Sequence, residues 1–324
     1  MAKNILVTGG AGKLGNYVCP YLKEQGYNVT SFDRVPLVMG DTSANSKAGV
    51  PYVYGDLLSL GDCMRAIAHA QADYIVHLGA IPYNTETQPA YARDYAHADG
   101  ARFMQRTGED DTMKINTMGT YYVLDAARRL GVKNVIAAST YFVLGIGFRI
   151  SGTSFVPEYL PIDEDHPLLP EDTYSLSKYL NEETMKAFAR AYGMKFVAMR
   201  LLGVFYEDNE FSKRVYKFGV TVPEPKPEEV DYMVSNTYQF VDARDIARFV
   251  ELAIEADNLS PFEAFYLATD TTYVDDTVDV IKRRWPSLAA KGLGAGIKGA
   301  DGIISIDKAK NLLGYNPQFS WRNK

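Results

Sequence analysis

A glycine-rich turn between two regular elements constrains the fold of this chain more than any other feature. The turn, Thr8-Gly9-Gly10-Ala11-Gly12-Lys13-Leu14-Gly15, follows an apolar run at residues 4–7 and leads into a helix-like run at residues 14–25. Glycines permit a tight turn and the close approach of a ligand, and a helix start offers N–H groups and a positive dipole to phosphate. The stretch therefore predicts a strand–turn–helix unit that binds the pyrophosphate of a dinucleotide.

An acidic residue at the end of the next apolar run narrows the choice of dinucleotide. Asp33 follows residues 28–32, about 20 positions after the glycines. A carboxylate at this place accepts hydrogen bonds from the adenosine ribose hydroxyls and repels a 2′-phosphate. We therefore expect NAD, and the neighbouring Arg34 keeps NADP open as a minority alternative.

Short apolar runs and helical patterns continue to alternate after this unit. Strands are predicted at residues 50–54, 73–78 and 134–138, and helices at residues 60–70 and 113–130. Such alternation is typical of an α/β protein with a parallel sheet covered on both faces. Ligands of these sheets bind at the carboxyl ends of the strands, which places Asp56, Leu78 and Ala80 at the cofactor crevice. The strand at 134–138 delivers Ser139 and Thr140 at its own carboxyl end.

The composition argues against several other classes of protein. With 34 basic and 40 acidic residues among 324, the net charge of −6 gives no reason to expect nucleic acid or an anionic membrane surface as partner. No apolar run approaches the ~20 residues of a membrane span, and the early first strand leaves no room for a signal peptide. The two cysteines lie in predicted helices and form no disulfide framework, which suits the cytoplasm. No histidines and acids occur at metal-ligand spacing, so no metal is expected.

The segment at residues 82–112 interrupts the alternation. It is long and polar, and it contains several tyrosines and arginines. Connections of this length usually serve a binding site or are disordered. The segment therefore either lines a pocket or a subunit contact, or forms a solvated surface insertion, and the sequence leaves both alternatives open.

A tyrosine and a lysine four positions apart open the helix predicted at residues 174–192. Tyr174 and Lys178 share one face of that helix, so they can serve one site. A free tyrosine titrates near pH ~10, but a lysine cation and an oxidised nicotinamide ring both favour the phenolate. The pair is therefore a candidate for acid–base chemistry beside a nicotinamide.

Together these features resemble the extended short-chain dehydrogenase/reductase superfamily and, within it, the NAD-dependent epimerase/dehydratase family. The resemblance extends to Asn116 with Gly119-Thr120, to Arg200 after a strand at residues 195–199, and to the stretches 240–247 and 307–317. It implies a Rossmann-type doubly wound parallel sheet with a smaller, discontinuous C-terminal substrate domain. The implied NAD-binding domain comprises residues 1–200 and 236–258, and the implied substrate domain comprises residues 201–235 and 259–324.

The resemblance also assigns roles to individual residues. Tyr174 would transfer the proton, Lys178 would bind the nicotinamide ribose and lower the pKa of Tyr174, and Thr140 would hydrogen-bond the reacting oxygen. The cofactor is expected to be NAD, bound by Gly9, Gly12, Lys13, Leu14, Gly15, Asp33, Arg34, Asp56, Leu57, Leu78, Gly79, Ala80, Asn116, Ser139, Tyr174, Lys178 and Leu201.

Three positions depart from patterns found elsewhere in the family. Members acting on nucleotide-sugars often carry Arg-x-x-Asn where this chain has Arg200-Leu201-Leu202-Gly203. They also often carry a pyrophosphate-binding arginine where this chain has Tyr238, so both departures weaken the case for a nucleotide-sugar substrate. Dehydratases place an acidic pair beside the Ser/Thr, but Tyr141-Phe142 follow Thr140 here, so we expect no dehydration.

The leading hypothesis is an NAD-dependent enzyme that oxidises a hydroxyl of a small sugar, sugar acid or polyol. The first alternative is an NAD-dependent sugar or nucleotide-sugar 4-epimerase, and the second is a non-catalytic dinucleotide-binding sensor. The resemblance further implies a homodimer that pairs the helices around residues 115–130 and 175–192.

Several other side chains are predicted from their position in the sequence. His77 lies within an apolar strand and is predicted to be a packed core histidine. Asp245 is predicted to cap a helix at residues 246–256. Arg200 either forms a structural pair or faces a ligand. The basic residues at 211–217 either bind a carboxylate or phosphate or form a solvated helix face.

Overall fold

The computed structural model describes residues 2–35, 40–85, 108–147, 149–226 and 237–322, together with the backbone of 93–96 and 102–105. The chain forms two compact units. The first unit comprises Met1–Ala138, Thr173–Ala198 and Ala253–Glu263, and the second comprises Ser139–Asp172, Met199–Leu252 and Ala264–Lys324. The division into a cofactor domain and a substrate domain stays a prediction.

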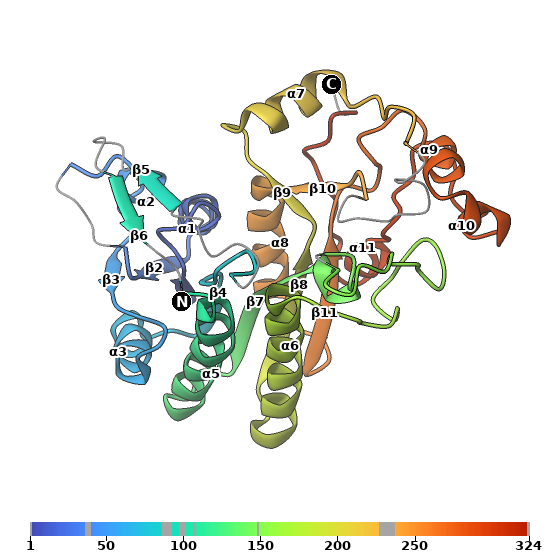
Figure 1. Ribbon diagram of the computed structural model, residues 1–324. Coiled ribbons are helices and arrows are strands. Elements are labelled where there is room, and N and C mark those ends of the chain that lie inside the picture. Colours follow the sequence, from blue (N-terminus) through green and yellow to red (C-terminus); the bar gives the residue numbers. More distant parts are fainter. Residues whose placement is uncertain are drawn as a thin grey trace. The chain divides into compact units, whose positions relative to one another are not determined.

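The central element is a seven-stranded sheet in the order β11-β8-β7-β4-β1-β2-β3 (Figure 1). Its strands are β1 (Asn4–Thr8), β2 (Asn28–Asp33), β3 (Tyr52–Tyr54), β4 (Tyr74–His77), β7 (Asn134–Thr140), β8 (Lys195–Leu201) and β11 (Phe262–Leu267). The strands β3, β2, β1, β4 and β7 pair in parallel with their neighbours in that order. This sheet confirms the predicted α/β class and the doubly wound topology.

Helices of the first unit connect these parallel strands. They are α1 (Gly15–Glu24), α2 (Ala44–Lys47), α3 (Leu60–Ala70), α4 (Asp111–Met113), the π-helical turn η1 (Lys114–Met118), α5 (Gly119–Arg129) and α6 (Thr173–Tyr192). Helix α3 contacts α5, and α5 contacts α6, so the three lie side by side (Figure 1).

Helix α3 illustrates why the sequence forms these elements. It buries Cys63, Ala66 and Ile67, whose spacing places them on one face toward the sheet. Its start is capped by Ser59, whose side chain accepts a hydrogen bond from the backbone N–H of Asp62 at 3.1 Å. The predicted bounds of this helix agree with the observed ones.

The second unit contains a further parallel strand pair and most of the remaining helices. Its elements are η2 (Tyr141–Leu144), β9 (Gly203–Phe205), α7 (Glu210–Phe218), β10 (Phe240–Asp242), α8 (Ala243–Glu255), α9 (Thr277–Arg284), α10 (Pro286–Ala290) and α11 (Asp307–Leu313). Strands β9 and β10 pair in parallel, and the rings of Phe205 and Phe240 stack with centroids 4.1 Å apart. Trp285 is buried.

Two local predictions differ from the structure. Residues 34–49 are rich in Gly, Ser, Asn and Asp, which predicts a loop, but they contain the short helix α2, whose start Ser43 caps by accepting a hydrogen bond from the backbone N–H of Ser46. The predicted capping role of Asp245 is wrong. Helix α8 begins at Ala243, and the Asp245 carboxylate accepts instead from the backbone N–H groups of Gln318 at 2.9 Å and Phe319 at 3.0 Å. That carboxylate therefore anchors the C-terminal segment.

Part of the segment at residues 82–112 forms an antiparallel hairpin. Strand β5 (Arg93–Ala96) pairs with β6 (Arg102–Gln105). Residues 86–92, 97–101 and 106–107 lie outside the described residues. The choice between a pocket-lining segment and a solvated insertion stays open.

Among the helices of the described ranges, none is long and apolar enough to cross a membrane.

Candidate functional site

The glycine turn closes tightly against the end of a neighbouring strand. Gly9 has a φ of +68°, and its backbone N–H donates to the carbonyl of Phe32 at 2.9 Å. A Cβ atom at Gly9 would lie 2.6 Å from the Cα of Gly79, just after β4. A side chain at this position would therefore displace backbone, and the turn requires glycine both for its dihedral angle and for this approach.

The first helix begins directly against the same turn. A Cβ atom at Gly15, the first residue of α1, would lie 2.3 Å from the carbonyl oxygen of Gly10. The first N–H groups of an α-helix have no acceptor within the helix. The first turn of α1 contains no acidic residue, and Lys13 just before it is exposed. The helix start thus fits the pyrophosphate of a dinucleotide.

The side chain of Asp33 is held by backbone N–H groups of the glycine turn and of the two residues that follow Asp33. Its Oδ2 accepts from the N–H of Ala11 at 3.1 Å, and its Oδ1 accepts from the N–H groups of Arg34 at 2.7 Å and Val35 at 3.3 Å. Burial raises the pKa of this carboxyl, while the three N–H donors and the Arg34 charge oppose the rise. Each carboxylate oxygen can accept two hydrogen bonds, so Oδ2 keeps capacity for a ribose hydroxyl.

Two asparagines that the sequence reasoning missed also hold the turn. Asn16 donates from its amide to the carbonyls of Ala11 and Gly12, both at 3.1 Å. Asn45 of α2 donates to the carbonyl of Gly10 at 2.7 Å, and its backbone N–H donates to the side-chain oxygen of Asn16 at 3.2 Å. Asn16 lies four residues after Gly12, one helical turn, and was detectable from that spacing. Asn45 gives no local signal.

Leu57 brings several of the predicted cofactor residues together. A Cβ atom at Gly79 would lie 2.7 Å from the Leu57 Cδ1, and one at Gly119 would lie 3.0 Å from the Leu57 Cβ. Leu57 therefore packs between the end of β4 and the start of α5. The preceding Asp56 accepts from the backbone N–H of Leu58 at 2.9 Å.

The predicted lysine is buried within the first unit. The Nζ of Lys178 donates to the carbonyl of Ala138 at 2.8 Å, and burial lowers the pKa of Lys178 to about 8. Tyr174 lies one helical turn earlier and is half-buried. Its backbone carbonyl accepts from the hydroxyl of Ser177 at 2.7 Å, which fixes the first turn of α6.

Asn116 connects that first turn to the exit of β4. Its amide group donates to the Ser177 hydroxyl and to the carbonyl of Ile81, both at 3.0 Å, and its Oδ1 accepts from the Ile81 N–H at 2.8 Å. These partners, Ile81 and Ser177, lie in the first unit, where Asn116 is fully buried. Its position thus supports a structural contribution to the site, and its predicted contact with NAD stays a prediction.

Three further predicted residues belong to the second unit. Ser139 and Thr140 are the last residues of β7, and the Oγ1 of Thr140 accepts from the N–H of Phe142 at 3.3 Å. Leu201 is the buried last residue of β8. Their predicted roles toward cofactor and substrate stay predictions.

The contacts of Arg200 favour the structural alternative. Its guanidinium is buried, donates to the carbonyl of Glu164 at 3.3 Å and lies 5.3 Å from the centre of the Tyr266 ring. The Glu164 carboxylate in turn accepts from the backbone N–H of Tyr266 at 2.8 Å. These contacts tie a loop of the second unit to β11.

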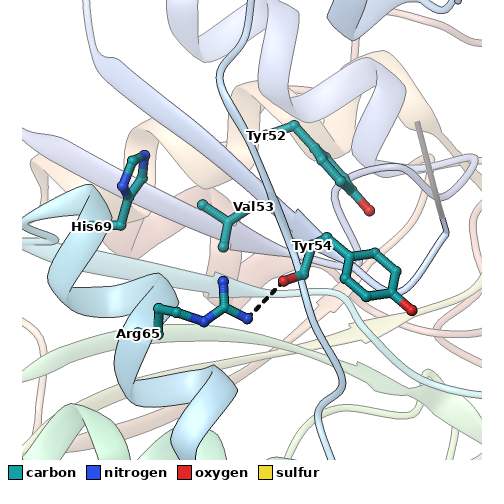
Figure 2. A pocket seen from close by; sticks show the side chains of 5 residues that line it. All are labelled: Tyr52, Val53, Tyr54, Arg65 and His69. Carbon is teal, nitrogen blue, oxygen red and sulfur yellow. Dashed lines mark hydrogen bonds between the residues drawn. The ribbon is translucent and has the colours of Figure 1, made fainter. Parts of the chain in front are cut away.

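A hollow at the edge of the sheet lies apart from these residues. It has a volume of about 370 Å³ and is lined by Tyr52, Val53, Tyr54, Arg65 and His69. Figure 2 shows Arg65 donating to the Tyr54 carbonyl, at 2.8 Å, so the guanidinium is engaged with the rim of the hollow. The described lining contains none of the predicted cofactor or catalytic residues.

Within the described residues, no group of three or more His, Cys, Asp or Glu side chains is arranged to hold a metal ion. The donor groups gathered in the first unit are instead backbone N–H groups at a helix start and one carboxylate beside them. That arrangement is typical of a dinucleotide-binding α/β protein.

The sequence identifies the family. A profile of the NAD dependent epimerase/dehydratase family matches residues 5–106 and 96–268, so the chain belongs to that family. This membership confirms the predicted family and the predicted cofactor, NAD. The chain is therefore an NAD-dependent enzyme of the epimerase and dehydrogenase type.

Known relatives cover nearly the whole chain. A putative UDP-glucose 4-epimerase of Methanocaldococcus jannaschii is 26% identical over 326 residues, which cover 97% of this chain and 93% of the relative. Among solved structures, the UDP-glucose 4-epimerase of Brucella ovis in complex with NAD has a TM-score of 0.66 at 22% identity and covers 98% of this chain and 94% of its own. A mutated uronate dehydrogenase has a TM-score of 0.59 at 21% identity, with coverages of 99% and 84%. The two structures share the fold.

Proposed function

We propose that this chain oxidises a hydroxyl of a small sugar, sugar acid or polyol, with NAD as the hydride acceptor. The observation that carries the proposal is Tyr238, which occupies the place where nucleotide-sugar enzymes of the family often have a pyrophosphate-binding arginine. Tyr238 is buried, and its ring lies 5.8 Å from that of Tyr273. A packed neutral phenol does not neutralise a diphosphate, so the position favours a substrate without one.

The segment after Arg200 supports the same conclusion. Where those enzymes have an asparagine, this chain has Gly203, which has no side chain to bind a sugar nucleotide. Leu202 before it is buried. In helix α7, Lys213 forms an exposed ion pair with Glu210 at 2.7 Å, which favours a solvated helix face over an anion site there.

In the proposed reaction, the phenolate of Tyr174 accepts the proton of the substrate hydroxyl while the carbon loses a hydride. The buried ammonium of Lys178 favours that phenolate, and its bond to the Ala138 carbonyl fixes its position. The hydroxyl of Thr140 orients the reacting oxygen. NAD, when bound, supplies the nicotinamide C4 that takes the hydride.

A second candidate is an NAD-dependent sugar or nucleotide-sugar 4-epimerase. The relative from M. jannaschii that matches over nearly its whole length is described as a putative UDP-glucose 4-epimerase, and this favours it. An epimerase returns the hydride to the substrate, so its turnover produces no net reduced cofactor. The sensor alternative predicts NAD binding without turnover of either kind.

One assay separates these functions. Purified protein is incubated with NAD and, in parallel, D-glucuronate, D-glucose, a polyol mixture and UDP-glucose, while reduced nicotinamide is followed by absorbance and sugars by chromatography. If the protein is a dehydrogenase, reduced nicotinamide should form with at least one free sugar, sugar acid or polyol. This formation should be lost in Tyr174→Phe. Conversion of UDP-glucose without net reduction would establish the epimerase instead.

The tyrosine variant needs a matched control. Tyr174→Phe should lower kcat by about 10²- to 10⁴-fold, because it removes the proton acceptor, while NAD affinity is retained. Tyr192→Phe removes an exposed hydroxyl at the far end of the same helix and should leave kcat unchanged. Equal activities of the two variants would remove Tyr174 from the mechanism.

A further inference from the structure

A series of buried hydrogen bonds begins where the glycine turn begins. The hydroxyl of Thr8, the last residue of β1, lies 2.6 Å from the Nδ1 of His77, the last residue of β4. The Nε2 of His77 lies 3.0 Å from the hydroxyl of Thr120 in α5. All three side chains are buried, with His77 5% exposed, so the prediction of a packed core histidine is confirmed.

The series continues to the helix that carries Tyr174. The hydroxyl of Thr120 donates to the backbone carbonyl of Asn116 at 2.6 Å, within the π-helical turn η1. The Asn116 amide donates to Ser177, whose hydroxyl donates to the carbonyl of Tyr174. The end of β1, the end of β4, the start of α5 and the start of α6 are thus joined by side chains of the first unit.

The directions of these hydrogen bonds follow from the groups at the two ends. The Asn116 carbonyl can only accept, so the Thr120 proton points to it, and Thr120 must accept from His77. His77 therefore carries its proton on Nε2. Its Nδ1 accepts the Thr8 proton, and the Thr8 oxygen accepts the N–H of Gly79 at 3.4 Å.

The reverse set of hydrogen-bond directions, with the His77 proton on Nδ1, leaves buried groups without a partner. If Nδ1 of His77 carried the proton, the Thr8 hydroxyl would have no acceptor among the partners that the structure describes. With Thr120 donating to Nε2, its oxygen and the Asn116 carbonyl oxygen would lie 2.6 Å apart with no proton between them. Unsatisfied buried groups of this kind are costly, so one tautomer of His77 is strongly preferred.

We propose that His77 is a positioning residue that holds the cofactor-binding turn and the helix start bearing Tyr174 in register, through a neutral ring protonated on Nε2. Its Nδ1 fixes Thr8 at the entrance to the glycine turn, and its Nε2–H fixes Thr120 and, through Asn116 and Ser177, the first turn of α6. The role of Nδ1 in NAD binding rests on the NAD dependence of the family. The role of Nε2 in turnover rests on the function proposed above for Tyr174.

The surroundings keep the ring in this state. Burial lowers the pKa of His77 to about 3, and the charge of Lys178 acts in the same direction. A second proton would have to go on Nδ1. The Nδ1–H group would then donate to the Thr8 oxygen, and the Thr8 hydroxyl proton would lose its acceptor. The ring therefore serves as one fixed donor and one fixed acceptor, and it does not act as an acid or base.

Two amide variants separate the two sides of the ring. His77→Asn places an acceptor near the Nδ1 position and loses the donor to Thr120. We expect NAD affinity within about twofold of wild type and a kcat about tenfold lower. His77→Gln reaches the Nε2 position with a donor and loses the acceptor for Thr8. We expect about tenfold weaker NAD binding and a kcat near wild type at saturating NAD.

Further variants provide controls. Thr120→Val deletes the same link as His77→Asn without changing the ring, so it should reproduce the lower kcat with retained NAD affinity. His69→Asn makes the same substitution at an exposed histidine of α3 and should change neither quantity. Identical effects of His77→Asn and His77→Gln on kcat and on NAD affinity would overturn the positioning role.

A spectroscopic measurement tests the tautomer in the unaltered protein. ¹⁵N-histidine NMR of the whole chain at pH 7 should show His77, identified by its absence in His77→Asn, protonated on Nε2. His166 provides an internal reference, because its Nδ1 lies 2.9 Å from the Pro167 carbonyl and its Nε2 accepts from the Glu158 N–H at 3.0 Å. Nδ1 protonation of His77 would overturn the proposal whatever the effects of the variants on kcat and NAD affinity. If wild type turns over no substrate, the proposed function fails, while NAD affinity and NMR still judge His77.

Discussion

Asp33 combines a predicted function in cofactor binding with an observed structural one. The sequence pattern assigns its carboxylate to the adenosine ribose, and the structure adds three bonds to backbone N–H groups, one of them from Ala11 within the glycine turn. The residue that is predicted to favour NAD over NADP therefore also shapes the turn that is proposed to receive the pyrophosphate.

A neutral replacement of Asp33 separates these functions. Asp33→Asn keeps the shape and one acceptor but removes the negative charge that repels a 2′-phosphate. We expect NAD binding to weaken about tenfold and the ratio of NADP to NAD dissociation constants to fall. Titration calorimetry with both cofactors measures this, and the exposed Asp270→Asn is the control. Tighter binding of NADP than NAD by the wild-type protein would refute the role of Asp33.

Lys178 makes stability depend on pH in a defined direction. Its folded-state pKa is about 8 and its ordinary value is 10.5, so between these values the unfolded chain binds more protons. The free energy of unfolding should therefore rise with pH across this window, by up to about 3 kcal/mol relative to Lys178→Met. Urea unfolding of both proteins at a series of pH values tests it, and a constant difference would contradict the burial of a titrating lysine.

At the scale of elements, the junction of β1 and α1 depends on Gly15, the first residue of α1. Gly15→Ala would place a Cβ atom 2.3 Å from the Gly10 carbonyl oxygen, so either the turn or the helix must move. We expect loss of NAD binding and destabilisation by about 1–3 kcal/mol. Thermal unfolding and cofactor titration measure the two effects.

Gly61 in α3 provides the matched control. It is exposed, and the nearest atom to an added Cβ would be the Ser59 Oγ at 3.9 Å. Gly61→Ala should stabilise the protein by about 0.5–1 kcal/mol, because alanine loses less backbone freedom on folding. A Gly15→Ala variant that behaved like Gly61→Ala would show that the turn tolerates a side chain.

At the start of α5, apolar periodicity predicts that a helix is present but not what type of helical turn it begins with. The apolar spacing predicts one helix over residues 113–130, and the structure has helix there, but with the π-helical turn Lys114–Met118 at its start. A π-helical turn is a single turn with i→i+5 backbone hydrogen bonds inside a longer helix, and apolar spacing over the whole helix does not distinguish it. Its contribution to the placement of Asn116 is therefore invisible in the sequence.

For the whole molecule, we expect a homodimer formed through α5 and α6. Tyr121, Leu180 and Tyr192 on these helices expose 42%, 37% and 49% of their surface. Leu180→Glu should shift the mass measured by light scattering from dimer toward monomer, because a charge is costly at a packed interface. Leu312→Glu, at an exposed position of α11, should not. An unchanged dimer in Leu180→Glu would place the interface elsewhere.

Local patterns predicted the architecture because each strand and helix is encoded by its own periodicity. The bounds of α3, the glycine turn and the acid after β2 all follow from neighbouring residues. The contacts of Asn45 and Asp245 do not, since their partners lie at least 29 and 73 residues away in the chain. Asp245 also stands before an apolar run like a cap, and only its burial against the C-terminal segment decides its partners.

The residues of the site likewise differ in how far their neighbours in the sequence determine them. It indicated Tyr174 and Lys178 from their spacing, and it treated His77 correctly as a core residue. The tautomer of His77 depends on a carbonyl 39 residues further along the chain, at Asn116, through Thr120. The tautomer can be inferred only from the structure, where the directions of all the hydrogen bonds in the network are assigned together.

The bond between Asp33 and Ala11 has a consequence for the kinetics of cofactor capture. Together with Asn16 and Asn45, it holds the turn through hydrogen bonds that the protein itself supplies. A receptor that is organised in advance loses little conformational entropy when its ligand arrives. Association with NAD should then be limited by encounter and orientation, with no slow ordering step after first contact.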